Sequence, residues 1–313
     1  MKYRSMLWCC ALALTLMAAL RLSGAALAGT DLFTPTPTDT APAPTTPNST
    51  FPTQITQPTE REEPPAAVLS FSPEDLEAVK MRYGCDYRPE LAPLLTAPLQ
   101  WDLTGSKPTV LILHTHATES FRGTYKQWVP YRTTDEDHNM VCIGREVARV
   151  LELGGITVLH DTTLHDYPHY NSAYSAARKT IRSYLEEYPT IRVVLDLHRD
   201  ASDDYDSPLT THATVAGQDS SQLMFVVGTD QGGLSNPDWP ENLALALKLT
   251  VLLEQENPGI TRGISLREQR FNLDLTPGSL LVEVGAAGDT REAALVAANA
   301  LAQALIALSA GTQ

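Results

Sequence analysis

The stretch TVLILHTHATESF, residues 109–121, joins an apolar run to a group of polar side chains. Residues 109–113 are typical of a strand that is covered on both faces of a parallel sheet, because the run is continuously apolar. His114, His116 and Glu119 follow that strand directly. In open parallel sheets, ligand sites lie outside the carboxyl ends of the strands. These three residues therefore indicate a ligand site at the carboxyl end of this strand.

The rest of the folded part repeats this alternation. Further strands are predicted at residues 156–160, 192–198, 223–229 and 280–284. Helical patterns lie between or after them, at residues 139–155, 172–188, 240–257 and 290–308. The alternation predicts an α/β fold with a mostly parallel sheet flanked by helices on both faces. A short helix is also expected at residues 72–84, with Ser72 as N-cap and Pro73 at its first position.

The N-terminal part is predicted to carry the domain out of the cytoplasm. Residues 1–29 contain a basic start and an apolar run broken by Arg21, which is typical of an export signal that is either cleaved or retained as a membrane anchor. Residues 30–65 are rich in Pro and Thr and predict a disordered linker. Residues 66–313 are expected to form the catalytic domain, either anchored to the membrane or secreted.

The net charge and the cysteine positions argue against a nucleic-acid-binding protein and against a zinc finger. The net charge of −14 argues against a nucleic-acid partner, because such binding depends on Lys and Arg neutralising phosphates. Cys9 and Cys10 lie in the apolar segment, which leaves Cys85 and Cys142 as a pair without zinc-finger spacing. A disulfide between them and two buried thiols are both compatible with the sequence.

Three predicted strand ends together offer a metal site. His116 and Glu119 can reach one ion from a single turn, and His198 arrives from another strand. Two histidines, a carboxylate and a water are a usual set for catalytic zinc. Glu283 lies inside the apolar run LLVEV, where burial of a carboxylate costs free energy unless it is paired or has a catalytic role. It is the expected general base.

Other roles for these residues remain open at this stage. Glu283 could instead pair with Arg199 or Arg267, and the planar guanidinium groups of those two arginines also suit carboxylates of a ligand. Asp196 or Asp200 could orient a ligand histidine. Three more histidines are expected in a loop or along the substrate groove; they are His160, His165 and His169.

Five segments together resemble one known family. They are ILHTHATESF (112–121), HDTTLHDYPHYNSAYSAARKTIRSYLEEYPTIRVVLDLHRDA (160–201), VVGTD (226–230), NPDWPENLALALKL (236–249) and RFNLDLTPGSLLVEVGAAGDTREAA (270–294). The chain is similar to the stage II sporulation protein P family over about residues 109–304. It departs from the family at AAGDT (286–290), where a polar, Asn-rich turn is expected.

The resemblance implies an amidase_3-like fold and a zinc-dependent N-acetylmuramoyl-L-alanine amidase. Such an enzyme hydrolyses peptidoglycan during sporulation engulfment, and the resemblance also implies cleavage of peptide cross-links. Stage II sporulation proteins D and M are the implied partners. By position, His116, Glu119 and His198 take the roles of Zn²⁺ ligands and Glu283 takes that of the catalytic residue.

The sequence leaves alternatives open for both the Zn²⁺ ligands and the function of the protein. His114 could replace His116, and Glu136 could replace Glu119, because the wider amidase group takes its carboxylate ligand further along the chain. Glu119 is preferred because it shares a turn with the histidine. The alternative functions are a zinc carboxypeptidase or endopeptidase of the cell wall, and a wall-binding module without catalysis.

Overall fold

The computed structural model describes residues 69–99, 102–124, 129–202 and 204–311. The predicted signal or anchor (1–29), the predicted linker (30–65) and the predicted start of the domain at Ala66 lie outside these ranges. The main sheet contains β1 (Met81–Gly84), β2 (Val110–Leu113), β3 (Val158–His160), β4 (Val193–Asp200), β7 (Leu223–Gly228), β8 (Thr261–Arg267) and β9 (Ser279–Ala286). A separate hairpin pairs β5 (Ala213–Val215) with β6 (Gln218–Ser220).

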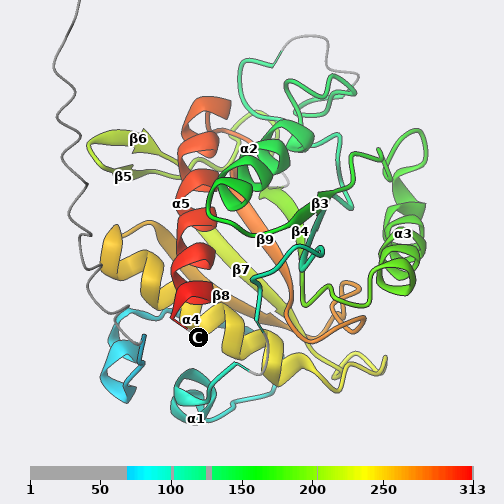
Figure 1. The fold of residues 1–313 in the computed structure, drawn as a ribbon. Helices are drawn as coiled ribbons and strands as arrows, with labels where there is room; N and C mark the ends of the chain where they lie inside the picture. The colour runs from blue at the N-terminus through cyan, green and yellow to red at the C-terminus, as the bar shows by residue number, and fades with distance from the viewer. Residues whose placement is uncertain (1–68, 100–101, 125–128, 203, 312–313) are drawn as a thin grey trace, which may run out of the picture. The chain divides into compact units, whose positions relative to one another are not determined.

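The helices are those that the apolar periodicity predicts, with short additions. They are α1 (Leu91–Thr96), α2 (Met140–Leu153), α3 (Ala173–Glu187), α4 (Trp239–Glu256) and α5 (Arg291–Ala310), with 3-10 turns η1 (Pro73–Ala78) and η2 (Tyr170–Ser172). The α/β alternation expected from the sequence is confirmed by this order of elements (Figure 1).

The sheet consists of two parallel blocks that meet at one antiparallel pair. The strand order is β1-β8-β7-β9-β4-β2-β3, and only β7 and β9 run in opposite directions as neighbours. The carboxyl ends of β2, β4 and β9 therefore lie at one edge, where the chain also enters β7. In this register Glu283 lies opposite His198 on one side and Met224 on the other.

One sequence prediction is wrong in its extent. The helix expected at residues 72–84 is a 3-10 turn that ends at Ala78, and residues 81–84 form strand β1 instead. The start is as expected, with Ser72 as N-cap and Pro at the first turn. Residues 81–84 form a strand because they pair in parallel with β8. This tertiary contact outweighs their local helix propensity, so it could not be predicted from the local sequence.

Strand β8 was not predicted from its sequence, TRGISLR. It alternates, with Ile264 and Leu266 in the core and Ser265 and Arg267 facing a pocket. A search for continuous apolar runs overlooks such a strand, because only one of its faces is covered by apolar side chains.

The two faces of the sheet are covered unequally. Helices α2, α4 and α5 pack together over one face, against residues such as Ile112, Leu195 and Val282 (Figure 1). Helix α5 is long and apolar enough to cross a membrane by composition, and here it packs between α2, α4 and the sheet. On the opposite face α3 covers the part around β2 and β4, with Leu111, Leu113 and Val194 among the residues that it packs against.

The histidine that ends β2 fixes how closely helix α2 approaches the sheet. His114 Nδ1 lies 3.0 Å from the carbonyl of Leu197, and its Nε2 lies 2.9 Å from Nε2 of His160. A Cβ atom added at Gly144 of α2 would lie 2.5 Å from both Nε2 atoms. Helix α2 can therefore pack here only with glycine at this position.

We expect Gly144→Ala to destabilise the protein, although alanine favours an ordinary helix interior by about 1 kcal/mol. The added methyl group must displace a buried pair of rings, and overpacking of this kind costs about 1–3 kcal/mol. Urea unfolding of Gly144→Ala, beside Glu152→Ala on the exposed side of α2, measures the difference. Equal or higher stability of Gly144→Ala would contradict the tight packing.

Candidate active site

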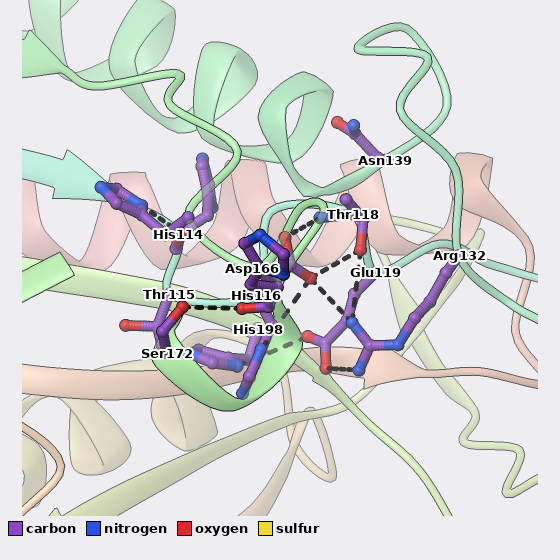
Figure 2. A network of polar contacts seen from close by, with 12 residues as sticks. His114, Thr115, His116, Thr118, Glu119, Arg132, Asn139, Asp166, Ser172 and His198 are labelled. Atoms are coloured by element: carbon purple, nitrogen blue, oxygen red, sulfur yellow. Dashed lines mark hydrogen bonds and ion pairs between the residues drawn. The ribbon is translucent and has the colours of Figure 1, made fainter. Parts of the chain in front are cut away.

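The predicted metal ligands come together at the carboxyl edge of β2 and β4. His198 Nδ1 lies 3.4 Å from Oε2 of Glu119, and the rings of His116 and His198 meet edge to face with centroids 5.3 Å apart (Figure 2). All three side chains are almost fully buried. The loop after β2 thus brings His116 and Glu119 to one point with His198 of β4.

Glu283 faces the same point from β9. It lies beside His198 in the register of the sheet and lines the same pocket. Its Oε2 atom is buried and has no hydrogen-bond partner among the described residues. Burial raises the pKa of Glu283 from 4.5 to about 8, and the neighbouring Glu119 adds to the shift. A carboxyl group with such a pKa can hold and release a proton near neutral pH.

Two buried aspartates hold the loop that carries His116 and Glu119. Asp196 of β4 accepts hydrogen bonds from the backbone N–H of Thr115 (2.7 Å) and from its hydroxyl (2.6 Å). Asp166 accepts the same pair from Thr118, at 3.2 and 2.6 Å (Figure 2). The backbone around His116 is therefore fixed by charge-assisted hydrogen bonds on both of its sides.

Arg132 connects the second aspartate to the candidate ligand Glu119. Its Nη1 donates to Asp166 at 2.8 Å, and its Nη2 lies 3.4 Å from Oε1 of Glu119. The guanidinium also lies over the ring of Tyr170, which stacks on His116 with centroids 4.5 Å apart. Asp166, Arg132 and Tyr170 had not been singled out in the sequence, since their roles depend on contacts between distant loops.

The other candidate residues lie in different surroundings. His114, the alternative to His116, pairs with His160 and the Leu197 carbonyl. Glu136, the alternative to Glu119, is half exposed and lies 4.0 Å from Arg145. Asp200 pairs with Arg262 at 2.7 Å. The structure therefore brings His116 and Glu119, rather than the two alternatives, to His198.

Arg199 and the remaining loop histidines have structural contacts. Arg199 donates to the carbonyls of Ser120 (3.0 Å) and Tyr131 (2.9 Å), and its backbone N–H donates to Glu119. His165 bridges the carbonyl of His114 and the hydroxyl of Thr180. Cys85 and Cys142 are both free and buried, so the pair of buried thiols is the alternative that the structure contains.

The charges around His198 favour a cation at its position. Burial alone would lower its pKa, but Asp196 and Glu119 raise it well above 6.5. Asp196 Oδ1 lies 3.1 Å from Nε2 of His198. The pKa of Glu119 is lowered despite its burial, because Arg199, His198 and His116 stabilise its charge. In contrast, burial lowers the pKa of His116 to about 4, which leaves that ring neutral.

These residues match a zinc site in the types of their donor groups. Two imidazoles and a carboxylate converge, and His116 Nδ1 is buried without a hydrogen-bond partner among the described residues. Among the described residues, no group of three or more His, Cys, Asp or Glu side chains has the spacing of a formed metal centre. The donor set thus fits zinc in its chemistry but not in its present spacing.

The cluster opens into a pocket of about 410 Å³. One half of its wall carries the histidines and carboxylates described above together with Tyr170 and Tyr174. The other half lies over β7, β8 and β9, on the part of the sheet that α3 leaves uncovered. The fold and the site define an α/β protein with a pocket of histidines and carboxylates at the carboxyl edge of its sheet.

Comparison with known proteins identifies the family. The profile of the stage II sporulation protein P (SpoIIP) family matches residues 42–306, and the chain belongs to this family. It is 28% identical to stage II sporulation protein P of Bacillus subtilis (strain 168) over 211 residues, which cover 64% of this chain and 50% of that protein. The chain thus matches about half the length of this curated relative.

The chain also aligns with solved structures of amidases. The N-acetylmuramoyl-L-alanine amidase AmiC2 of Nostoc punctiforme aligns with a TM-score of 0.36 and 16% identity, covering 64% of this chain and 97% of that one. The CwlD amidase from Clostridioides difficile, solved in complex with the GerS lipoprotein, aligns with a TM-score of 0.36 and 12% identity, covering 65% and 95%.

We expect Asp166→Asn to destabilise the fold by about 2 kcal/mol, because it leaves the half-buried Arg132 without its closest counter-charge. An amide nitrogen replaces one of the two acceptor oxygens, so it faces an N–H donor of either Thr118 or Arg132. Urea unfolding measures the loss, with the exposed Asp206→Asn as the matched control. A loss no larger than that of the control would contradict the role given to Asp166.

The raised pKa of Glu283 predicts a pH dependence of stability in the metal-free protein. The folded state keeps this proton up to about pH 8, while the unfolded chain releases it near pH 4.5. Rising pH therefore destabilises the fold within this window, by at most about 1.4 kcal/mol per pH unit. Glu283→Gln should remove this part of the slope, because an amide does not titrate.

Unfolding free energies of both proteins, measured from pH 5 to 8 with a chelator, test this expectation. Other titrating groups are common to the two proteins, so the difference between their slopes isolates Glu283. Parallel curves would mean that Glu283 ionises normally in the fold.

Proposed function

We propose that this protein is a zinc-dependent N-acetylmuramoyl-L-alanine amidase that hydrolyses peptidoglycan outside the cytoplasm during sporulation. The observation that carries the proposal is the meeting of His116, Glu119 and His198 at one point, with Glu283 directly beside it in the sheet. Membership of the stage II sporulation protein P family supports the biological setting.

In this proposal His116, Glu119 and His198 hold Zn²⁺. When bound, the metal supplies a Lewis acid that lowers the pKa of a water and polarises the carbonyl of the scissile amide. A cation there suits the negative charges of Glu119 and Asp196, which in the metal-free protein stabilise a protonated His198. Asp196 then lies beside the imidazole of His198 as an orienting partner.

Glu283 is the proposed general base and acid. It takes one proton from the attacking water and passes it to the amine nitrogen as the C–N bond breaks. The water oxygen remains on the lactyl carbonyl, so the products are a sugar with a free lactyl acid and a peptide with a free amino group. A carboxyl group whose pKa lies near neutrality without metal can serve both transfers.

The loop contacts explain how the site is preorganised. Asp196 and Asp166 fix the backbone on either side of His116, while Arg132 and Tyr170 restrict the ring and the Glu119 carboxylate. Little rearrangement is then needed when substrate binds, which favours catalysis. Cleavage of peptide cross-links and action with stage II sporulation proteins D and M remain predictions from the family resemblance.

Metal content and digestion products of the full chain test the proposal. We expect one zinc ion per wild-type chain and free stem peptides from purified wall, and His198→Ala should lose both. Glu283→Ala should keep its zinc and its fold while cleavage falls by about 10²–10⁴-fold. Free amino acids or split cross-links as the only products would favour a peptidase. A metal-free protein that binds wall without cleaving it would favour a binding module.

A further inference from the structure

The pocket continues well beyond the histidine cluster. Its floor runs over the uncovered face of the sheet, where Leu281 of β9 and Met224 and Val226 of β7 point into it. Phe271 forms part of the wall, and Ser265 and Arg267 of β8 line the far end. We call this half of the pocket the channel: its floor is apolar and ends at a cation, and the loop after β4, with Asp200 and Asp204, lines the pocket as well.

The wall of this channel is fixed before any ligand binds. The connection from β8 to β9 is tied to α3 by Arg178, which donates to both carboxylate oxygens of Asp274 at 2.7 Å. In the same connection, Asn272 donates to the carbonyl of Tyr174 at 2.8 Å. Buried, two-point contacts of this kind keep the channel open and in place.

Arg267 differs from the other arginines that line the pocket. Arg132 is occupied by Asp166, Glu119 and the Tyr170 ring, and Arg199 by two backbone carbonyls. Within the described residues, the guanidinium of Arg267 forms neither an ion pair nor a hydrogen bond, and the residue is exposed. Its charge and its donors are therefore available to a ligand in the channel.

We propose that Arg267 binds a carboxylate of the peptide part of the substrate and so sets which peptides the site accepts. This inference rests on the proposed amidase function. A guanidinium matches a carboxylate with two parallel hydrogen bonds, and the channel floor beside it suits the aliphatic parts of a peptide. The substrate class is then a muramoyl peptide with a free carboxylate at a defined distance from the cleaved amide.

The sheet register sets that distance. Arg267 lies level with Gly228 of β7, and Glu283 lies level with Met224 of the same strand. Four residues along a strand span about 13 Å and two strand spacings add about 10 Å across, so the two Cα atoms lie about 16 Å apart. The side chain of Arg267 lies against Gly84 of β1, since a Cβ atom added there would be 3.0 Å from its Cδ atom, so it does not shorten this distance. A peptide of four residues spans about 14 Å. The carboxylate bound by Arg267 thus belongs to about the fourth residue beyond the amide.

Kinetics of the full-length protein on two soluble substrates test the proposal. One is an N-acetylmuramoyl tetrapeptide with free carboxylates, and the other is its fully amidated derivative. Wild type should prefer the free acid through KM. Arg267→Gln should raise KM for the free acid about tenfold with kcat nearly unchanged, and it should no longer distinguish the two substrates. Arg267→Lys should recover part of the preference, because it keeps the charge and loses the fork.

The matched control is Arg182→Gln, which removes an exposed arginine of α3 that does not line the pocket. It should behave as wild type. If Arg267→Gln keeps the wild-type KM and the preference for the free acid, the carboxylate site is wrong and the amidase proposal stands. An equal rise in KM in Arg182→Gln and Arg267→Gln would also contradict a carboxylate site at Arg267. The effect would then come from the lower positive charge of the protein and not from a specific contact.

Binding of the free tetrapeptide, without the sugar, separates the two proposals. Calorimetry on the full-length protein should give a dissociation constant that rises about tenfold in Arg267→Gln and not in Arg182→Gln. If wild type cleaves neither substrate but binds the peptide through Arg267, the amidase proposal fails and the carboxylate site stands. Binding that is independent of Arg267 would overturn the carboxylate site.

Discussion

The structure of the site depends on two buried carboxylates that hold one loop. Asp196 and Asp166 each accept the backbone N–H and the hydroxyl of a threonine, Thr115 and Thr118, three residues apart. Such a four-point clamp leaves the intervening His116 with one orientation. Because Asp196 belongs to β4 and Asp166 to the loop before α3, the clamp also joins three parts of the chain that are distant in sequence.

The clamp places an unusual amount of charge in a small volume. Glu119, Asp166 and Asp196 are buried and Glu283 is half-buried, and Arg132 and Arg199 compensate only part of their charge. Isolated charges of this kind are too costly to bury. The arrangement is stable because burial raises the pKa of Glu283, which keeps its proton, and the surrounding carboxylates raise the pKa of His198, which gains one.

The asymmetry of the sheet explains why this cluster is accessible. Three helices cover one face and form a continuous apolar core, while α3 covers only the β2 and β4 side of the other face. The even-numbered residues of β4 at the carboxyl end, Asp196 and His198, point to the open side. The antiparallel pairing of β7 with β9 then adds an apolar floor next to the polar cluster, so that one pocket combines charged and apolar walls.

The sequence by itself determined the elements that are local and strongly patterned. Continuous apolar runs identified β2, β3, β4, β7 and β9, and helical periodicity identified α2 to α5. The order of His116, Glu119, His198 and Glu283 at strand ends indicated a common edge, since parallel strands bring their carboxyl ends together. Strands β1 and β8 could be recognised only in the tertiary structure. Residues 81–84 form β1 because they pair with β8. Strand β8 lacks a continuous apolar run because one of its faces lines the pocket.

Only the tertiary structure decided between neighbouring residues with the same chemistry. His114 and His116 are equivalent in sequence, but the turn after β2 sends one ring to His160 and Gly144 and the other to His198. Arg199 and Arg267 were equal candidates, and backbone carbonyls occupy only the first. Local patterns fix which residues lie on which strand end, whereas the partner of each side chain depends on loops that meet only in the folded chain.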